Sequence, residues 1–185
     1  MRPQEGYPTG VVRAVPRSCA VITDGNLHFR GCRDVPRRRG ILDFGRRIRL
    51  VLDTYVAVSG LLWHGSPGKL IDAAQAGSLT LYTSAPLLAE LHGVLARETF
   101  TKHLQDRELT ATQILEDYAA LTTVVVPAII TPVIIEDPDD DAVLACAVAA
   151  KVDLVVSGDP HLVKLAQYEG IPIVTPAEAV ERLHL

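Results

Sequence analysis

The sequence is poor in the residues on which several common kinds of site depend. Aromatic residues make up 5% of the 185 residues, and there are three cysteines, Cys19, Cys32 and Cys146. No CxxC pair and no His/Cys cluster has the spacing of a zinc site, and three scattered cysteines do not make a disulfide framework. The sequence therefore indicates neither a zinc protein nor a disulfide-stapled secreted protein. Its cysteine usage favours a reducing, cytoplasmic location.

Long apolar segments and glycine-rich phosphate loops are also missing. The longest apolar stretch, residues 124–135, is broken by Pro127 and Pro132 and is too short to span a bilayer. The first residues lack the continuous apolar run of a signal peptide, so we expect none. Neither GxGxxG nor GxxxxGK[ST] follows the strand expected at residues 49–52. These absences argue against a membrane protein and against a nucleotide site built on a glycine loop.

Charge divides the chain into two unlike parts. Residues 1–47 carry ten Arg and four acidic residues, whereas residues 48–185 carry eight Lys and Arg and eighteen acidic residues. The first part has no helical or strand periodicity and is punctuated by four prolines. We interpret residues 1–47 as a basic, disordered or non-core extension, with contact to nucleic acid phosphates as the alternative. The chain length then favours one domain, residues 48–185.

Short apolar strands alternate with helices from residue 48 onward. We expect strands at 49–52, 79–83, 153–157 and 171–174, and an extended stretch at 124–135. Helices lie between them, several with good capping residues; Ser66, Ser84, Thr110 and Thr175 are expected caps, and one helix is expected to run from Asp159 to about Tyr168. This alternation predicts an α/β fold with a parallel sheet that is covered by helices on both faces.

Acidic residues recur where the expected strands end. Asp53 directly follows the first strand, and Asp159 follows a later strand by three residues. A cluster that includes Asp140 and Asp141 begins an expected helix. Glu90 lies beside the apolar stripe of a different expected helix, where burial of an unpaired carboxylate costs free energy. Because the carboxyl ends of parallel strands meet at one edge, where α/β sheets place their ligands, we expect these acids to converge.

Helix capping is the simpler explanation for some of these acids. Asp159 precedes a proline, and Asp140 and Asp141 suit the dipole of a helix first turn. Capping explains Asp53 least well. The acidic domain offers no nearby Lys or Arg to form ion pairs with these acids. The acids therefore predict an oxygen-lined site for Mg²⁺ or Mn²⁺, which can activate water and hold a phosphate for in-line attack.

Five short motifs follow one another along residues 48–185. They are Leu52-Asp53-Thr54, Ser59-Gly60-Leu61-Leu62-Trp63, Leu88-Ala89-Glu90-Leu91, Asp137-Pro138-Asp139-Asp140 and Val155-Val156-Ser157-Gly158-Asp159. None is specific alone, but their order and spacing together resemble the PIN-domain proteins, in particular the VapC-like toxins of toxin–antitoxin systems.

The resemblance implies a three-layer α/β/α sandwich with a short parallel sheet. It also implies an endoribonuclease that depends on Mg²⁺ or Mn²⁺, with RNA as the substrate and an antitoxin protein as a partner. The site residues carried over are the acids Asp53, Glu90, Asp140 or Asp141 (Asp140 is preferred) and Asp159, with the supporting hydroxyl residues Thr54 and Ser157.

Charge suggests a role for each acid in such an enzyme. Asp53, Asp140 and Asp159 would hold the metal ion directly or through water. Glu90 would orient the attacking water or remove its proton. Because the domain is acidic, basic residues must offset its repulsion of RNA, and Lys69, Arg97 and Lys102 are candidates.

Tyr55 departs from the family pattern, in which Asn usually follows Asp-Thr. A phenol is bulkier than an amide and directs its hydrogen bonds differently. The alternative function is therefore a catalytically weakened PIN-like binding module, whose acids are neutralised by an Arg or Lys of a protein partner. A homodimer through Trp63 and the apolar helices at 87–95 and 114–121 is a further hypothesis, although a core role for these residues is favoured.

Overall fold

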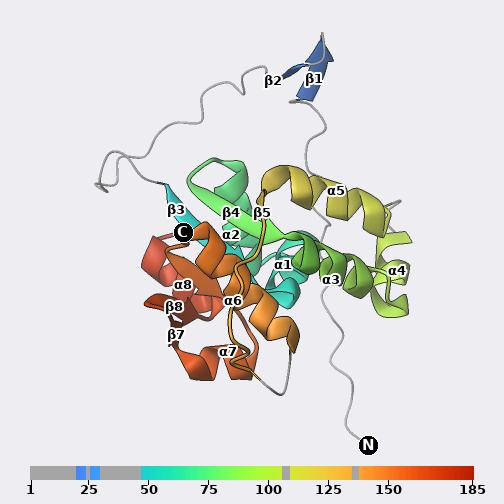
Figure 1. Cartoon of the computed structure of the whole chain (residues 1–185). Coiled ribbons are helices and arrows are strands. Elements are labelled where there is room, and N and C mark those ends of the chain that lie inside the picture. Colours follow the sequence, from blue (N-terminus) through green and yellow to red (C-terminus); the bar gives the residue numbers. More distant parts are fainter. Residues whose placement is uncertain (1–19, 24–25, 30–46, 106–108, 135–137) are drawn as a thin grey trace, which may run out of the picture. The chain divides into compact units, whose positions relative to one another are not determined.

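The computed structural model describes residues 20–23, 26–29, 47–105, 109–134 and 138–185 (Figure 1). The chain divides into two units, and residues 14–46 form the smaller one. In this unit β1 (Ala20–Thr23) and β2 (Asn26–Phe29) pair as antiparallel strands, which the sequence analysis did not predict. Apart from Arg47, the rest of the basic extension lies outside the described residues.

The larger unit is organised around a six-stranded sheet in the order β5-β4-β3-β6-β8-β7. Its neighbouring strands are parallel, except that β7 is antiparallel to β8. The two central strands, β3 and β6, pair so that Leu52 lies opposite Val156, and both strands end at the same edge. The strand bounds are β3 (Ile48–Leu52), β4 (Leu79–Ser84), β5 (Thr123–Val125), β6 (Leu154–Val156), β7 (Gln167–Tyr168) and β8 (Ile171–Val174).

Helices cover both faces of the sheet. Leu50 and Leu52 of β3 belong to a buried cluster with side chains of α1, α2, α3, α5 and α8. Val51 points the other way and packs with α6 and α7. The predicted α/β fold is thereby confirmed. The helix bounds are α1 (Thr54–Leu62), α2 (Ser66–Gln75), α3 (Ala85–Leu95), α4 (Glu98–Gln105), α5 (Ala111–Leu121), α6 (Pro138–Ala150), α7 (Pro160–Leu165) and α8 (Pro176–Leu183).

Local sequence explains where most helices begin. The predicted caps Thr110 and Thr175 each form a capping box, with side chain and backbone bonded reciprocally to Gln113 and Glu178. Ser84 is the N-cap residue of α3, although its side chain makes no capping hydrogen bond. The N-cap of α2 is Gly65, one residue before the predicted Ser66.

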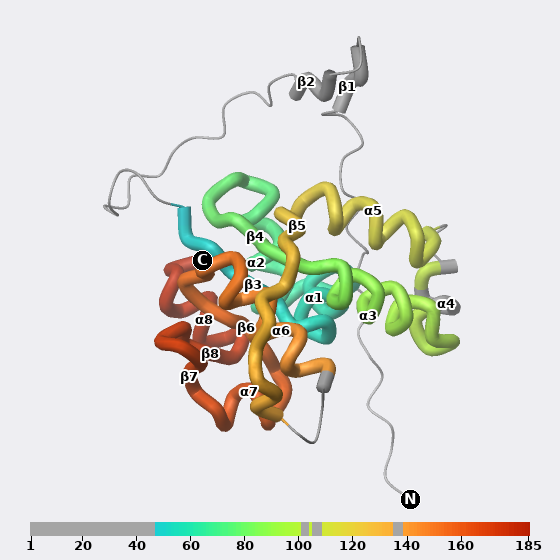
Figure 2. Tube along the Cα trace, viewed as in Figure 1, coloured from blue at the N-terminus to red at the C-terminus, as the bar shows by residue number. Residues whose placement is uncertain are grey.

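The helix predicted from Asp159 to about Tyr168 is shorter than expected. It ends at Leu165, because Ala166 adopts a positive φ of 60° and turns the chain. Residues 167 and 168 then form β7 on the edge of the sheet. After β5, residues 126–134 contain no regular element and run alongside α6, where the Ala128 amide donates to the Ala145 carbonyl at 3.0 Å (Figure 2).

The apolar residues considered for a homodimer belong to the core of a single chain. Leu91, Val94, Ile114 and Tyr118 are buried in the larger cluster. Trp63 packs edge-on against Phe100, with ring centroids 6.0 Å apart. The core explanation of these helices is therefore the one the structure supports. Across the described residues, no helix is long and apolar enough to cross a membrane.

Candidate active site

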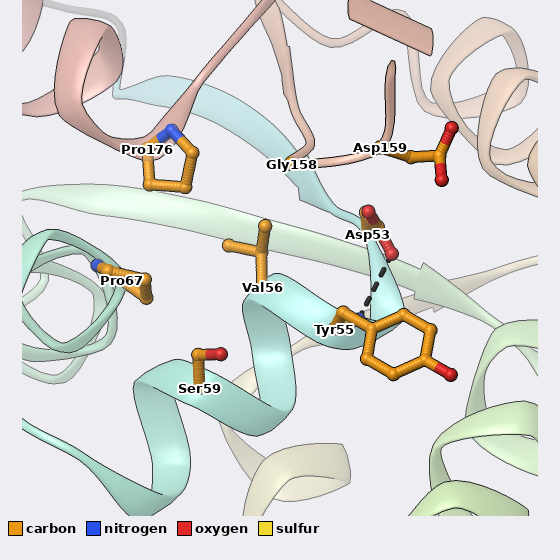
Figure 3. Close-up of a pocket in the computed structure, with 8 residues that line it drawn as sticks. All are labelled: Asp53, Tyr55, Val56, Ser59, Pro67, Gly158, Asp159 and Pro176. Atoms are coloured by element: carbon orange, nitrogen blue, oxygen red, sulfur yellow. Dashed lines mark hydrogen bonds between the residues drawn. The ribbon is translucent and has the colours of Figure 1, made fainter. Parts of the chain in front are cut away.

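Asp53 stands at the point where β3 becomes α1. Its amide donates to the Val156 carbonyl at 2.9 Å, which continues the β3–β6 pairing to the edge of the sheet. Its Oδ1 accepts from the Tyr55 amide at 3.0 Å and so caps α1 (Figure 3). Capping therefore explains Asp53 better than the sequence analysis supposed. The side chain is only 6% exposed, so a carboxylate at this position loses most of its hydration.

The surroundings of Asp53 oppose its ionisation. Burial raises the pKa of the Asp53 carboxyl, and hydrogen bonds from Ser157 and the Tyr55 amide offset part of that effect. The negative charge of Asp159 raises the pKa further. Because an adjacent positive charge favours the ionised form, a bound cation would relieve the cost of keeping this carboxylate charged.

Ser157 links Asp53 to Asp159 at the end of β6. Its buried hydroxyl donates to Asp53 Oδ2 at 2.6 Å and accepts from the Asp159 amide at 2.9 Å. Asp159 also caps α7, since its Oδ1 accepts from the His161 amide at 2.7 Å. Asp159 therefore caps α7, as predicted, and it also lies with Asp53 at the carboxyl edge of the sheet.

Glu90 reaches the same edge from α3. Its Oε2 accepts a hydrogen bond of 2.7 Å from the hydroxyl of Thr54, a buried residue in the first turn of α1. This contact provides the compensation that a half-buried acid beside an apolar stripe requires. It also fixes the position of the Glu90 carboxylate relative to Asp53, the residue before Thr54.

The structure distinguishes Asp140 from Asp141, which the sequence could not separate. Asp140 is buried, and it lines a pocket with Asp53. The Asp141 carboxylate instead accepts hydrogen bonds from the amides of Val133 and Ile134, at 3.1 to 3.2 Å. Asp140 is therefore the one of the two that faces the pocket.

The four acids that were singled out separately in the sequence line one pocket of about 420 Å³. They are Asp53, Glu90, Asp140 and Asp159, and Asp139 joins them. Asp141 and Lys69 are not among the lining residues. The Lys69 ammonium donates to the carbonyl of Leu185, and the side chain of Lys102 lies outside the described residues.

Arg97 also lines this pocket, which corrects the expectation that no basic residue lies near the acids. Its Nη1 donates to the Tyr55 hydroxyl at 2.8 Å. Arg97 lies two residues beyond Leu95, the last residue of α3, so its position depends on the path of the chain after the helix. Helical periodicity in the sequence therefore does not place Arg97 with the acids.

The donor set fits a hard divalent cation. The acids supply only oxygen ligands, which Mg²⁺ and Mn²⁺ prefer, and the pocket offers no sulfur or imidazole ligand among its lining residues. Within the described residues, no three His, Cys, Asp or Glu side chains are close enough to hold a metal on their own. Mg²⁺ commonly retains several waters and uses one or two carboxylates, so a pocket lined by spaced acids suits it.

Fold and site together define a three-layer α/β protein with an acidic pocket at the carboxyl edge of a parallel sheet. The family model of the PIN domain matches residues 49–161, more than half of the chain, and the chain belongs to the PIN-domain family. PIN domains are generally nucleases, and those nucleases generally use divalent metal ions. The resemblance to PIN-domain proteins drawn from the five motifs is thereby confirmed. A search of curated proteins found no match.

Proposed function

We propose that this protein is an endoribonuclease that depends on Mg²⁺ or Mn²⁺. The observation that carries the proposal is the convergence of Asp53, Glu90, Asp140 and Asp159 on one pocket from four separate segments of the chain. Capping alone does not require this convergence, since a cap needs only the helix that it begins. A nuclease does require it, because its cation, water and phosphate must meet at one point.

Each residue of the pocket has a distinct task in this proposal. Asp53, Asp140 and Asp159 would hold the cation directly or through water, with Ser157 keeping the Asp53 carboxylate in position. A bound divalent cation lowers the pKa of its water and neutralises charge on the phosphate. Glu90, fixed by the Thr54 hydroxyl, orients the attacking water and accepts its proton. Arg97 at the rim offsets the repulsion between the acidic pocket and the RNA backbone.

Cleavage of a structured RNA pool by the purified full chain tests this function. We expect cleavage with Mn²⁺ or Mg²⁺ and none after EDTA. Asp53→Asn should reduce the rate at least about 100-fold, the scale seen when a group that stabilises the transition state is removed. Glu116→Gln, which neutralises an exposed acid on α5, is the matched control and should cleave like wild type. Full activity of Asp53→Asn, or of the wild type in EDTA, would refute the mechanism.

Tyr55 was the reason to consider a weakened binding module instead. In the structure its side chain is 52% exposed, and its amide holds Asp53. The phenol therefore does not displace the four acids from the pocket. The retained acids favour catalysis over the binding module. The module alternative makes a different prediction: no metal binding by calorimetry and no cleavage of RNA.

We further propose that the enzyme acts in the cytoplasm as the toxin of a toxin–antitoxin pair. An antitoxin would present an Arg or Lys side chain to the acidic pocket and so compete with the cation. Induced expression should then arrest growth, Asp53→Asn should not, and a cognate antitoxin should restore growth unless its basic side chain is removed. Equal growth arrest by wild type and Asp53→Asn would argue against a toxic nuclease.

A homodimer is a further proposal. Because Leu91, Val94, Ile114 and Tyr118 pack inside one chain, a dimer would use other side chains. Sedimentation equilibrium of the purified protein measures its mass directly. A mass of 20.0 kDa over the micromolar range would exclude a stable dimer.

A further inference from the structure

We propose that a second cavity beside the acidic pocket binds one unpaired nucleobase of the RNA substrate, and that Tyr55 is its stacking surface. The proposal rests on the proposed ribonuclease activity and adds a substrate-positioning site to it. The cavity has a volume of about 330 Å³ and shares Asp53, Tyr55 and Asp159 with the acidic pocket. A base in the cavity would therefore belong to a nucleotide next to the phosphate at the acids.

The rest of this cavity is mostly apolar. Val56, Pro67 and Pro176 come from the starts of three helices, α1, α2 and α8, and Ser59 adds a hydroxyl (Figure 3). The two prolines lie on the side opposite Tyr55 and Asp159. An apolar wall with a single hydroxyl suits a flat, neutral ring that has hydrogen-bonding edges, because Ser59 can donate or accept.

Charge favours a base over a phosphate in this cavity. Asp53 and Asp159 border it, and two carboxylates would repel an anion. Arg97 lines the acidic pocket and is not among the residues that line the second cavity. The negatively charged backbone is therefore directed toward the acidic pocket with its cation and Arg97, and the uncharged base toward the cavity.

Tyr55 has the position and the support that a stacking residue needs. Its side chain is 52% exposed, and it lines both cavities. Its hydroxyl accepts a hydrogen bond from Arg97, so the ring is held at the rim before RNA arrives. Stacking on a fixed ring costs less conformational entropy than stacking on a mobile one. Removal of such a ring typically weakens binding by about 5- to 150-fold per base.

The test uses RNA oligonucleotides that lack a single base. An oligonucleotide that the full-length wild type cuts at one bond is resynthesised with an abasic ribose at each of three positions on either side. We expect one abasic position next to the cut bond to reduce kcat/KM at least about fivefold. Tyr55→Ala should cut intact RNA more slowly and should cut intact and abasic RNA at similar rates. Tyr55→Phe should keep the wild-type difference between intact and abasic RNA, because the ring remains.

A second variant fills the cavity instead of removing its wall. A Cβ added at Gly158 meets no other atom within 4 Å, so Gly158→Ala can add a methyl group at the cavity wall without a clash. It should slow cleavage of intact RNA and leave cleavage of the abasic RNA nearly unchanged. Thermal unfolding of each variant shows whether the chain is folded, and Glu116→Gln should keep the wild-type discrimination.

The outcomes separate this proposal from the ribonuclease activity. A wild-type chain that cuts no RNA under any metal condition overturns both. A chain that cuts RNA but is indifferent to every abasic position overturns the base site alone, and so does a Tyr55→Ala variant with wild-type discrimination. If Tyr55→Ala only abolishes inhibition by a protein partner, the ring belongs to a protein interface and the base site is refuted.

Discussion

The hydroxyl of Ser157 donates a hydrogen bond of 2.6 Å to Oδ2 of Asp53, across 104 residues of sequence. The two residues directly follow the adjacent parallel strands β6 and β3. The hydrogen bond therefore joins the ends of these two strands at the edge of the sheet. The same hydroxyl accepts from the Asp159 amide at 2.9 Å. One buried serine therefore determines how two of the four acids are placed.

Ser157→Ala should impair catalysis and shift its pH dependence. The Ser157 bond lowers the pKa of Asp53, so its loss should raise that pKa further. Because Asp53 acts as a carboxylate, the acidic limb of kcat/KM should move to higher pH, and activity at pH 7 should fall about tenfold or more. A pH series of kcat/KM measures both effects. Ser78→Ala, at an exposed position after α2, should reproduce the wild-type profile.

Asp53→Asn should stabilise the metal-free protein while it abolishes activity. Burial raises the folded-state pKa of Asp53 above its usual value of 3.8, so ionisation opposes folding. The stability is highest where Asp53 is protonated, and it falls as the pH rises from the unfolded pKa through the raised folded pKa. At pH 7 in EDTA, Asn removes this cost, and a gain on the order of 1 kcal/mol would raise Tm by about 2–4 °C.

The comparison must be made in EDTA, at pH 7 and again near pH 4. The stability advantage of Asp53→Asn should shrink at the lower pH, because a larger fraction of the wild-type carboxyl, whose pKa is raised, is then protonated. A Tm of Asp53→Asn below that of wild type at both pH values would show that the capping and Ser157 contacts outweigh the cost of the buried charge.

The strands β3, β4, β6 and β8 and their order of appearance could be predicted because aliphatic runs such as Leu50-Val51-Leu52 carry a clear signal. β7 could not be predicted, since two residues contain no periodicity, and its pairing depends on the turn at Ala166. Asp53 and Asp159 could be assigned to one edge because parallel strands end together. Arg97 was harder to place because its approach to Tyr55 depends on how α3 packs against α1.

Divalent metal should stabilise the wild type but not Asp53→Asn. A ligand that binds only the folded state adds RT ln(1 + [L]/Kd), which is about 2.7 kcal/mol at 100 times Kd. Thermal unfolding in increasing Mn²⁺ should therefore raise the wild-type Tm progressively. Glu116→Gln should follow the wild-type curve, because its exposed side chain lies on α5, away from the pocket. An equal rise for Asp53→Asn would mean that the stabilising metal binds elsewhere.

Asp140 and Asp141 should respond to substitution in opposite ways. Asp140→Asn changes a buried residue that lines the acidic pocket, so we expect it to reduce cleavage at least about 100-fold. Asp141→Ala removes the acceptor for the Val133 and Ile134 amides, which should cost about 1 kcal/mol of stability. Denaturant unfolding measures that loss, and the cleavage rate per folded molecule should stay within about twofold of wild type. The reverse result, an inactive Asp141→Ala beside an active Asp140→Asn, would transfer the metal-holding role to Asp141.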